Sequence, residues 1–342
     1  MTGLERRYHR LMFAYPAGYR RGHATEMVTT LLEMADDGQT RPTRGDAWDL
    51  LVSGVRQRFR LPSGRPLLYV VAVLVTLIGG GFGAAAGSWA ATSTMADLPS
   101  QAGIESLTRQ IAGDGSDFHT SRISTPWTVT FADAGIDAGA AWTPDAARRT
   151  LSADGWELGS IQPRSGVTST WDPVTGAQIS QELRGSSFEA TRDGLTMDVT
   201  AYVSGEHGQI LLTASPLDNG TLLPLVIAGA MLGLLGGWLL VAAGGYRLRS
   251  SSRPRLASAL TALAVVALAV PAFAFWVNVW RVAGTSDDPI YTVHSALSPD
   301  LYWSYGWPWM LVELSVAGLL LAVGAWFALR GRSVPSPAQL PA

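Results

Sequence analysis

Four long runs of apolar residues dominate the hydrophobicity pattern of this chain. The first occupies residues 65–91, and it carries no charge from Leu67 to Ala91. At about 1.5 Å per residue, such a run forms a helix of roughly 37 Å, which is long enough to cross a bilayer. A polar segment precedes it, so we do not expect a cleavable signal peptide, whose apolar region lies close to Met1. We therefore expect the first transmembrane helix at this position.

Three further apolar runs follow in the C-terminal part of the chain. They occupy residues 221–246, 256–279 and 309–329, and each is long enough to span a bilayer. Pro271 falls inside the third run, where it predicts a kink because it removes a backbone hydrogen bond. Residues 280–308 then form a short loop between the last two helices.

Residues 1–64 carry apolar stripes of helical spacing and predict three short helices. The first stripe runs from Leu4 to Tyr15, and the second runs from Met27 to Met34. The third helix is expected to begin at Thr43, which has nearly capping-box spacing with Asp46. Its stripe predicts buried side chains at Trp48, Leu51, Val52, Val55 and Phe59, with Arg56, Arg58 and Arg60 on the far face.

Residues 92–220 are polar and predict a small α+β domain with an antiparallel or mixed sheet. Asp193-Gly194 separates two alternating segments, which is a strong signal for a two-residue hairpin. Thr143-Pro144-Asp145 has the composition of a helix start and predicts a helix from Pro144 to Ala153. A short helix after Pro99 and strands at 127–131, 156–161, 188–192, 195–204 and 209–215 complete the expected domain.

The arginines of the short loops predict the orientation of the helices. Arg residues gather in residues 1–64, between Arg247 and Arg255, and in the Pro-rich tail at 330–342, which we expect to be disordered. The charged residues of the loop at 280–308 are mostly Asp. We therefore expect a multi-pass protein of the cell membrane with both termini in the cytoplasm. Its fold class is membrane all-α, with four transmembrane helices, a small extracytoplasmic α+β domain and a cytoplasmic N-terminal helical segment.

Composition narrows the classes of function. Hydrophobic residues make up 47% and charged residues 15% of the 342 residues, which is typical of a membrane protein with polar domains. Every basic residue is Arg, so a P-loop, which needs Lys, is excluded, and ATP-dependent work would need an ATPase partner. The absence of Cys excludes disulfides, Cys-zinc sites and thiol nucleophiles.

Residues 4–38 carry three dipeptides that recur in a known group of proteins. They are Tyr15-Pro16, Tyr19-Arg20 and Glu26-Met27, within LERRYHRLMFAYPAGYRRGHATEMVTTLLEMADDG. The segment resembles the permease-prefix domain of uncharacterised actinobacterial multi-pass membrane proteins and of some permease-like proteins. That group is often associated with PadR-type regulators, so the resemblance implies a transcriptional regulator encoded in the same operon.

Two series of glycines are candidate helix-packing residues in the first two apolar runs. Each series is a doubled G-x-x-x-G on one helical face, which permits close approach of two backbones. The favoured interpretation is packing of the two helices within one chain, and the alternative is a homodimer. The residues are Gly79, Gly83 and Gly87 in the first run and Gly229, Gly233 and Gly237 in the second.

Two polar residues are candidates for an intramembrane function. Glu313 lies inside the fourth apolar run, where an acid at the bilayer centre costs on the order of 3 kcal/mol. It is only one turn from the outer interface, where this cost falls. Asn278 is the second candidate, and Asn278 or Arg281 could partner Glu313 at the same depth.

Signals for an enzyme are weak in this chain. His119 and His207 match no metal-ligand spacing and are interpreted as solvated loop residues, with a metal at Asp117 and His119 as the alternative. The sequence holds neither a Gly-x-Ser-x-Gly elbow nor a His-Glu-x-x-His motif. We therefore expect no enzymatic activity, no cofactor and no metal.

The aromatic run at 300–309 is favoured as an interfacial belt, and a cage for a cation or a lipid headgroup is the alternative. The basic face from Arg56 to Arg65 is expected to contact anionic lipid headgroups of the bilayer rather than nucleic acid. The predicted function is sensing or regulation at the cell envelope through the extracytoplasmic domain, with a cytoplasmic regulator as partner. The alternative is an accessory or permease-like subunit of a transporter, with an ATPase as partner.

Overall fold

The computed structural model describes most of the chain. The described residues are 2–36, 38–62, 66–112, 130–137, 143–171, 178–204, 207–249, 251–284, 292–297 and 309–330. The chain divides into two compact units. The first comprises Met1–Gly83, Gly229–Ala274 and Leu311–Ala342, and the second comprises Ala84–Ala228 and Phe275–Met310.

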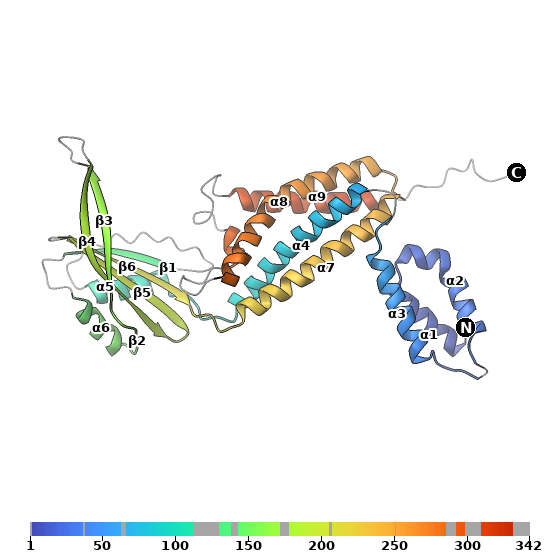
Figure 1. Ribbon diagram of the computed structural model, residues 1–342, viewed down its shortest axis with the longest axis horizontal. Coiled ribbons are helices and arrows are strands. Elements are labelled where there is room, and N and C mark those ends of the chain that lie inside the picture. The colour runs from blue at the N-terminus through green and yellow to red at the C-terminus, as the bar shows by residue number, and fades with distance from the viewer. Residues whose placement is uncertain are drawn as a thin grey trace. The chain divides into compact units, whose positions relative to one another are not determined.

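Four described helices are long and apolar enough to cross a membrane (Figure 1). They are α4 (Pro66–Thr92), α7 (Leu222–Arg249), α8 (Pro254–Gly284) and α9 (Met310–Arg330). The prediction of four such helices is confirmed. Helix α8 continues beyond the expected end at residue 279, and Pro271 lies inside it.

Within the first unit, the four long helices contact one another. Helix α4 contacts α8, α8 contacts α9, α9 contacts α7, and α7 contacts α4. Ile78 of α4 packs against Leu268 of α8, and Gly318 of α9 packs against the same leucine. The guanidinium of Arg247 on α7 lies 4.1 Å from the ring centroid of Trp326 on α9. Helix α4 also contacts α7 along its glycines.

The three helices predicted for the N-terminal segment are confirmed, and we call them the prefix helices. They are α1 (Gly3–Leu11), α2 (Ala17–Glu33) and α3 (Arg44–Phe59), and a short 3-10 helix, η1 (Met12–Ala14), follows α1. Helix α1 begins with a capping box between Thr2 and Glu5, and α3 begins with one between Thr43 and Asp46. Their common core consists of Leu4, Tyr8, Met12, Tyr15, Val28 and Leu50.

The predicted buried face of α3 is wrong. Helix α3 turns Leu50 and Gly54 toward the prefix core instead. A Cβ at Gly54 would lie only 2.7 Å from the Cβ of Ala14, so the close crossing with η1 requires glycine. The side chains predicted to be buried are exposed at Trp48 (67%), Leu51 (40%), Val52 (45%) and Val55 (48%), and half-buried at Phe59.

The position of Arg58 also differs from the prediction. The sequence places it on the far, solvated face of α3, but its guanidinium donates hydrogen bonds of 2.6 Å to the carbonyl oxygens of Phe13 and Ala14. These two carbonyls lie at the end of η1, where a helix leaves its last carbonyls without intrahelical partners. The arginine therefore fixes how α3 crosses η1.

The second unit contains a six-stranded antiparallel sheet, which together with two helices we call the sheet domain. The strand order is β1-β6-β5-β4-β2, and β3 pairs with β4 beside β2. The predicted small α+β region is therefore confirmed, with an antiparallel sheet. The strands are β1 (Thr130–Asp137), β2 (Glu157–Leu158), β3 (Gln162–Trp171), β4 (Gln178–Arg192), β5 (Leu195–Ser204) and β6 (His207–Pro216).

Two local predictions in the sheet domain are confirmed by the backbone. Asp193 (φ 51°) and Gly194 (φ 78°) join β4 to β5, as a two-residue hairpin turn with two positive φ angles requires. Helix α6 (Pro144–Ala153) has the predicted bounds, and its N-cap Thr143 accepts a hydrogen bond of 3.2 Å from the Ala146 amide.

The strand predictions before the hairpin are partly wrong. The strand expected at 156–161 shrinks to β2, while β3 was missed and β4 begins ten residues before the predicted start at residue 188. Strand β3 pairs with β4 alone and leaves Val167 67% exposed, so its sequence has no alternating apolar pattern. Trp127 and Val129 of the first predicted strand lie outside the described residues.

Helices α5 (Gln101–Ala112) and α6 cover one face of the sheet (Figure 1). Ile104 and Ile111 of α5 and Leu151 of α6 are almost completely buried, as the apolar spacing of these helices predicts. The strands contribute side chains from alternate positions, since successive residues of a strand point to opposite faces. These residues are Phe188, Ala190, Met197, Val199, Ala201, Ile210, Leu212 and Ala214.

Candidate functional site

The glycines predicted to pack helices lie along one contact between α4 and α7, which we call the glycine seam. A Cβ at Gly79 would meet the carbonyl oxygen of Gly233, and one at Gly83 would meet that of Gly229. The contact is reciprocal, because a Cβ at Gly233 would meet the carbonyl oxygen of Gly79. At Gly237 the added atom would lie 2.6 Å from the Val75 carbonyl oxygen and 2.9 Å from the Thr76 Cα. A Cβ at Gly87 would meet the carbonyl oxygen of Leu225.

The partner of each seam glycine is therefore backbone, which cannot move aside as a side chain can. Close approach of this kind gives van der Waals contact between helices and allows weak Cα–H···O hydrogen bonds. The structure brings the two glycine faces together within one chain. A residue larger than glycine at position 79, 83, 87, 233 or 237 must therefore push α4 and α7 apart.

Within the second unit, hydrogen bonds tie the chain leaving α4 to the chain entering α7. The hydroxyl oxygens of Thr94 and Thr221 lie 3.0 Å apart. The Asn219 side-chain amide donates to the Thr94 carbonyl oxygen at 3.0 Å. We call these three residues the domain junction, because the sheet domain begins and ends there.

Within the first unit, α7 holds the connection between α3 and α4. The indole N–H of Trp238 donates to the carbonyl oxygen of Phe59 at 3.0 Å. Leu61 is buried in a cluster with Ala72 of α4 and Val241 of α7. We call Phe59, Leu61 and Trp238 the prefix junction. The α4 and α7 pair is therefore fixed at two places, one beside the prefix helices and one beside the sheet domain.

A buried polar cluster joins the segment before α9 to α4 and α8. The short 3-10 helix η2 (His294–Leu297) follows Val293, whose amide donates to Ser88 Oγ on α4 at 2.9 Å. His294 Nδ1 lies 3.1 Å from the same oxygen. Ser88 is completely buried and already accepts the Val293 amide, so we interpret the serine and histidine as a structural pair rather than a nucleophile with its base.

Asn278 of α8 belongs to this cluster. Its side-chain amide lies 3.3 Å from the Thr292 carbonyl oxygen and 3.5 Å from Ser295 Oγ. Ser295 Oγ donates to the same carbonyl at 2.6 Å. The candidate Asn278 therefore contacts residues 292–295, which accounts for a buried amide in an apolar helix. The Thr292 hydroxyl is buried and has no hydrogen-bond partner within the part of the chain that the structure describes.

Burial lowers the pKa of His294 to about 4 from its ordinary value of 6.5, because the charged imidazolium loses its hydration. Only 4% of the residue is exposed. The imidazole is therefore neutral at pH 7. The buried position of His294 therefore favours the unprotonated form, and we expect acid to weaken the packing of residues 292–297.

The other intramembrane candidate, Glu313, lies in the first turn of α9 with an exposed side chain. A carboxylate in the first turn is stabilised by the unpaired amides and the dipole of the helix start. This position accounts for an acid in the helix without a catalytic role. Arg281, its predicted alternative partner, is also exposed, in the last turn of α8.

Several sequence candidates lie outside the described residues, namely Asp117, His119 and residues 300–308 of the aromatic run. Trp309, at the end of that run, is 57% exposed. His207 begins β6 opposite Asp137. Among the residues described, no group of three or more His, Cys, Asp or Glu side chains could hold a metal ion.

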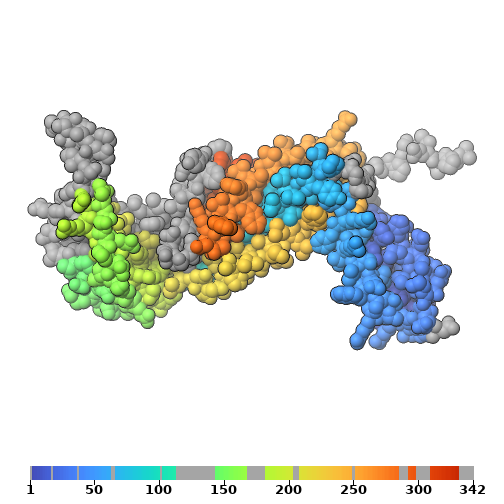
Figure 2. Space-filling view, in the orientation of Figure 1, coloured from blue at the N-terminus to red at the C-terminus, as the bar shows by residue number. Residues whose placement is uncertain are grey.

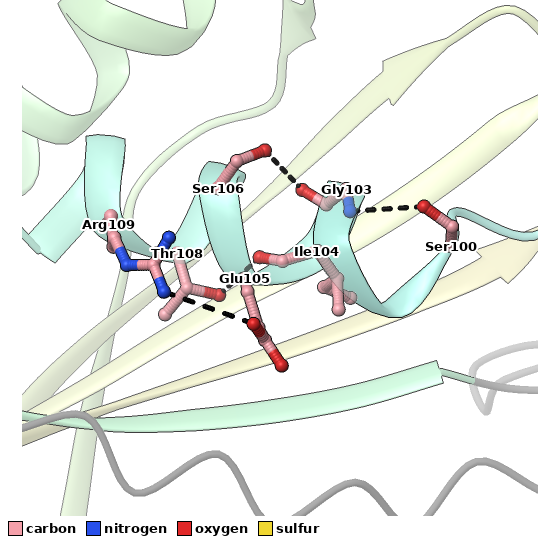
Figure 3. A network of polar contacts seen from close by, with 7 residues as sticks. All are labelled: Ser100, Gly103, Ile104, Glu105, Ser106, Thr108 and Arg109. Atoms are coloured by element: carbon pink, nitrogen blue, oxygen red, sulfur yellow. Dashed lines mark hydrogen bonds and ion pairs between the residues drawn. The ribbon is translucent and has the colours of Figure 1, made fainter.

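A network of polar contacts runs along α5 and the residue before it (Figure 3). Ser100 Oγ accepts the Gly103 amide at 3.1 Å, as an N-cap does. The buried Thr108 hydroxyl donates to the Ile104 carbonyl oxygen at 2.7 Å. Arg109 forms an i, i+4 ion pair of 3.9 Å with Glu105. These contacts stabilise α5.

Sequence reasoning missed the buried polar cluster around His294. Its available signals were Ser88 and Asn278, two polar residues inside apolar runs. The sequence could not show that they meet, because Ser88 and His294 are far apart in the chain.

Comparison with protein-family models, curated proteins and solved structures found no match to this chain.

Proposed function

We propose that this chain is a non-enzymatic integral membrane protein that senses or regulates at the cell envelope. In this proposal, the sheet domain faces the outside and binds a ligand or a protein. The prefix helices face the cytoplasm and engage a regulator. The observation that carries the proposal is the backbone contact of α4 and α7 along the glycine seam.

The order of the chain explains why this contact matters. Helix α4 connects the prefix helices to the sheet domain, and α7 begins where the sheet domain ends. The domain junction at Thr94, Asn219 and Thr221 links both helices to one end of the sheet domain. A rearrangement there would displace the two helices together, since closely packed helices shift as units rather than deform. The prefix junction at Phe59 and Trp238 would receive that displacement.

An accessory or permease-like subunit of a transporter is the second candidate function. The resemblance of residues 4–38 to the permease-prefix domain favours it. A chain that itself carried substrate would need polar or broken helices near the middle of the bilayer. The amide of Asn278 contacts residues 292–295 instead. The transporter role is therefore an accessory one, with an ATPase as partner.

Pull-down of the full chain in mild detergent, followed by mass spectrometry of bound proteins, distinguishes the two functions. We expect a transcription factor or sigma factor, and we expect its recovery to fall in a Gly233→Leu variant that opens the glycine seam. Recovery of an ATPase in place of a regulator would contradict the sensing role. Gly236→Leu is the matched control, because a Cβ at Gly236 meets nothing within 4 Å.

The orientation is tested separately with reporter fusions. Fusions after residues 150 and 295 are expected to report an extracytoplasmic position, and fusions after residues 40, 251 and 335 a cytoplasmic one. A cytoplasmic signal at residue 150 would reverse the topology and remove the basis for an external sensor.

A further inference from the structure

We propose that helix α3 lies on the anionic lipid surface of the membrane that contains α4, with one apolar face in contact with lipid. We call this surface the α3 face, and it consists of Trp48, Leu51, Val52 and Val55. The proposal requires only that α4 spans the membrane, and it does not depend on the sensing role.

The α3 face is apolar, contiguous and uncovered by the other prefix helices. Its residues follow i, i+3, i+4 and i+7 spacing and therefore share one side of the helix. Their exposed fractions lie between 40% and 67%, while Leu50 and Gly54 face the prefix core. In Figure 2, the lighter blue atoms of α3 form one side of the prefix, and the darker blue atoms of α1 and α2 form the other.

The connection to α4 holds α3 close to the membrane. Helix α3 ends at Phe59 and α4 begins at Pro66, so the two helix ends lie at most about 25 Å apart. The prefix junction shortens this distance, because Trp238 binds the Phe59 carbonyl and Leu61 is buried beside α4 and α7. The C-terminal end of α3 is therefore held at the end of two membrane-spanning helices.

The first turns of α4 also expose apolar side chains. Leu67 is 78% exposed and Val70 is 56% exposed, and both lie in the first turns of a helix that crosses the membrane. Lipid is the environment that covers such side chains on α4. The same lipid surface lies within reach of the α3 face, and covering that face removes apolar area from water.

The charges beside the α3 face match an anionic membrane surface. Arg56 and Arg60 are exposed on the neighbouring side of α3, and Arg44 lies at its first turn. Asp49 is also exposed there, so the exposed charge is positive overall. Helices that lie in the membrane interface carry Trp and Leu on the apolar face and basic residues on the polar face.

A second copy of the chain and a protein partner are the other occupants to consider. Stable protein interfaces bury about 800 Å² on each partner and contain a fully buried centre. The α3 face offers four side chains that are only partly exposed, which is too little area for such an interface alone. Lipid needs no such minimum, because the helix is already tethered to the bilayer.

Spin labels on single cysteines test the proposal in the full chain, which has no Cys of its own. Val52→Cys and Val55→Cys place labels on the α3 face, and Asp49→Cys is the matched control on the exposed polar side of the same helix. The proteins are reconstituted in nanodiscs of phosphatidylglycerol and phosphatidylcholine. Power-saturation electron paramagnetic resonance then gives the accessibility of each label to oxygen, which enters lipid, and to a water-soluble nickel chelate.

We expect a higher oxygen-to-nickel accessibility ratio at residues 52 and 55 than at residue 49. Equal ratios at the three positions would place the α3 face in water and overturn the proposal. Loss of access to both reagents at 52 and 55 would overturn it in favour of a protein occupant. In that case, spectral broadening that disappears on dilution with unlabelled chain would identify a second copy.

The contribution of anionic lipid is tested with Arg56→Gln and Arg60→Gln. Each substitution is expected to lower the ratio of docked to undocked α3 about fivefold in discs that contain phosphatidylglycerol. Neither should have an effect in pure phosphatidylcholine. Arg6→Gln, which removes an exposed arginine from α1, is the control and should change nothing. Identical label accessibility of the Arg56→Gln variant and its parent in phosphatidylglycerol would contradict the anionic surface.

Discussion

Helices α4 and α7 meet backbone to backbone, whereas α8 and α9 meet through side chains. A Cβ at Gly79, Gly83 or Gly233 would collide with a carbonyl oxygen of the opposite helix. A Cβ at Gly318 of α9 would instead meet the side-chain atoms of Leu268 at 2.5 and 2.6 Å. Leucine can change its rotamer, while a helix carbonyl is fixed by its hydrogen bond.

The bundle can therefore adjust at one of these contacts and not at the other. The α8 and α9 pair can repack around a moved leucine, because interiors tolerate changes that conserve volume. The α4 and α7 pair has no side chain to rearrange at the seam, so it keeps its geometry or separates. A rigid pair between the sheet domain and the prefix helices suits a protein that transmits a change from one to the other.

Breaking the rigid pair should have the largest effect. Gly233→Leu is expected to destabilise the protein in detergent by about 3 kcal/mol, because a side chain replaces direct backbone contact. Gly236→Leu, on the same helix but in open space, should leave the free energy of unfolding nearly unchanged. Chemical denaturation of both variants measures the difference, and equal stability would show that the seam contact is weak.

Acid should weaken a second contact of α4, the one with residues 292–297. Burial lowers the pKa of His294 to about 4, so below pH 6.5 the undocked segment binds a proton that the docked segment does not. The docked state of residues 292–297 therefore keeps its full stability above pH 6.5. At pH 5 the free energy of docking is weaker by about 2 kcal/mol. Hydrogen exchange of the Val293 amide, corrected for its intrinsic rate, should accelerate at pH 5.

His294→Gln provides the control for this acid sensitivity. The variant cannot titrate in this range, so the exchange of Val293 should no longer depend on pH beyond the intrinsic rate. A wild-type profile that matches that of His294→Gln would show that the histidine is not the titrating group.

A substitution between α8 and α9 should destabilise the protein less, and a second substitution should partly relieve the loss. Gly318→Ala is expected to cost about 1 to 2 kcal/mol, because Leu268 must move. Adding Leu268→Ala should give a double variant that is less destabilised than the sum of the two single variants. Strict additivity in this double-mutant cycle would mean that the two residues do not interact. The destabilisation caused by Gly79→Ala cannot be relieved in this way, because the added Cβ meets backbone atoms of Gly233 and Gly237.

Removing the membrane helices should have the smallest effect on the sheet domain itself. Residues 93–220 include the core that α5 and α6 close over the sheet, and their length suffices for an independent domain. The isolated segment is expected to unfold cooperatively, with a stability that reductant does not change, because the chain has no Cys. A fragment without near-ultraviolet circular dichroism would show that the core depends on the membrane helices.

Helices α5 and α3 illustrate what the apolar pattern can and cannot predict. Both carry an apolar stripe with helical spacing, and the pattern correctly places a helix at each. In α5, Ile104 and Ile111 are 2% and 3% exposed, but in α3 Trp48 is 67% exposed. Periodicity identifies the apolar side of a helix and does not identify what covers it.

The same limit applies to the sheet and to the candidate site. The turn at Asp193 and Gly194 was predictable because its backbone angles restrict the residue types. Strand β3 was not, because it pairs with β4 alone and buries little. The glycine spacing indicated a close helix contact, but the meeting of Ser88 with His294 depends on tertiary packing.

Hydrogen exchange of the full chain in nanodiscs tests most directly whether the glycine seam couples the two junctions. We predict that Gly233→Leu accelerates amide exchange at both the prefix junction, around residues 59–62, and the domain junction, around residues 92–96 and 217–221. Gly236→Leu should match the wild type at both. If Gly233→Leu changes neither junction, or changes only the prefix junction that lies nearer in its own unit, the seam does not connect the sheet domain to the prefix.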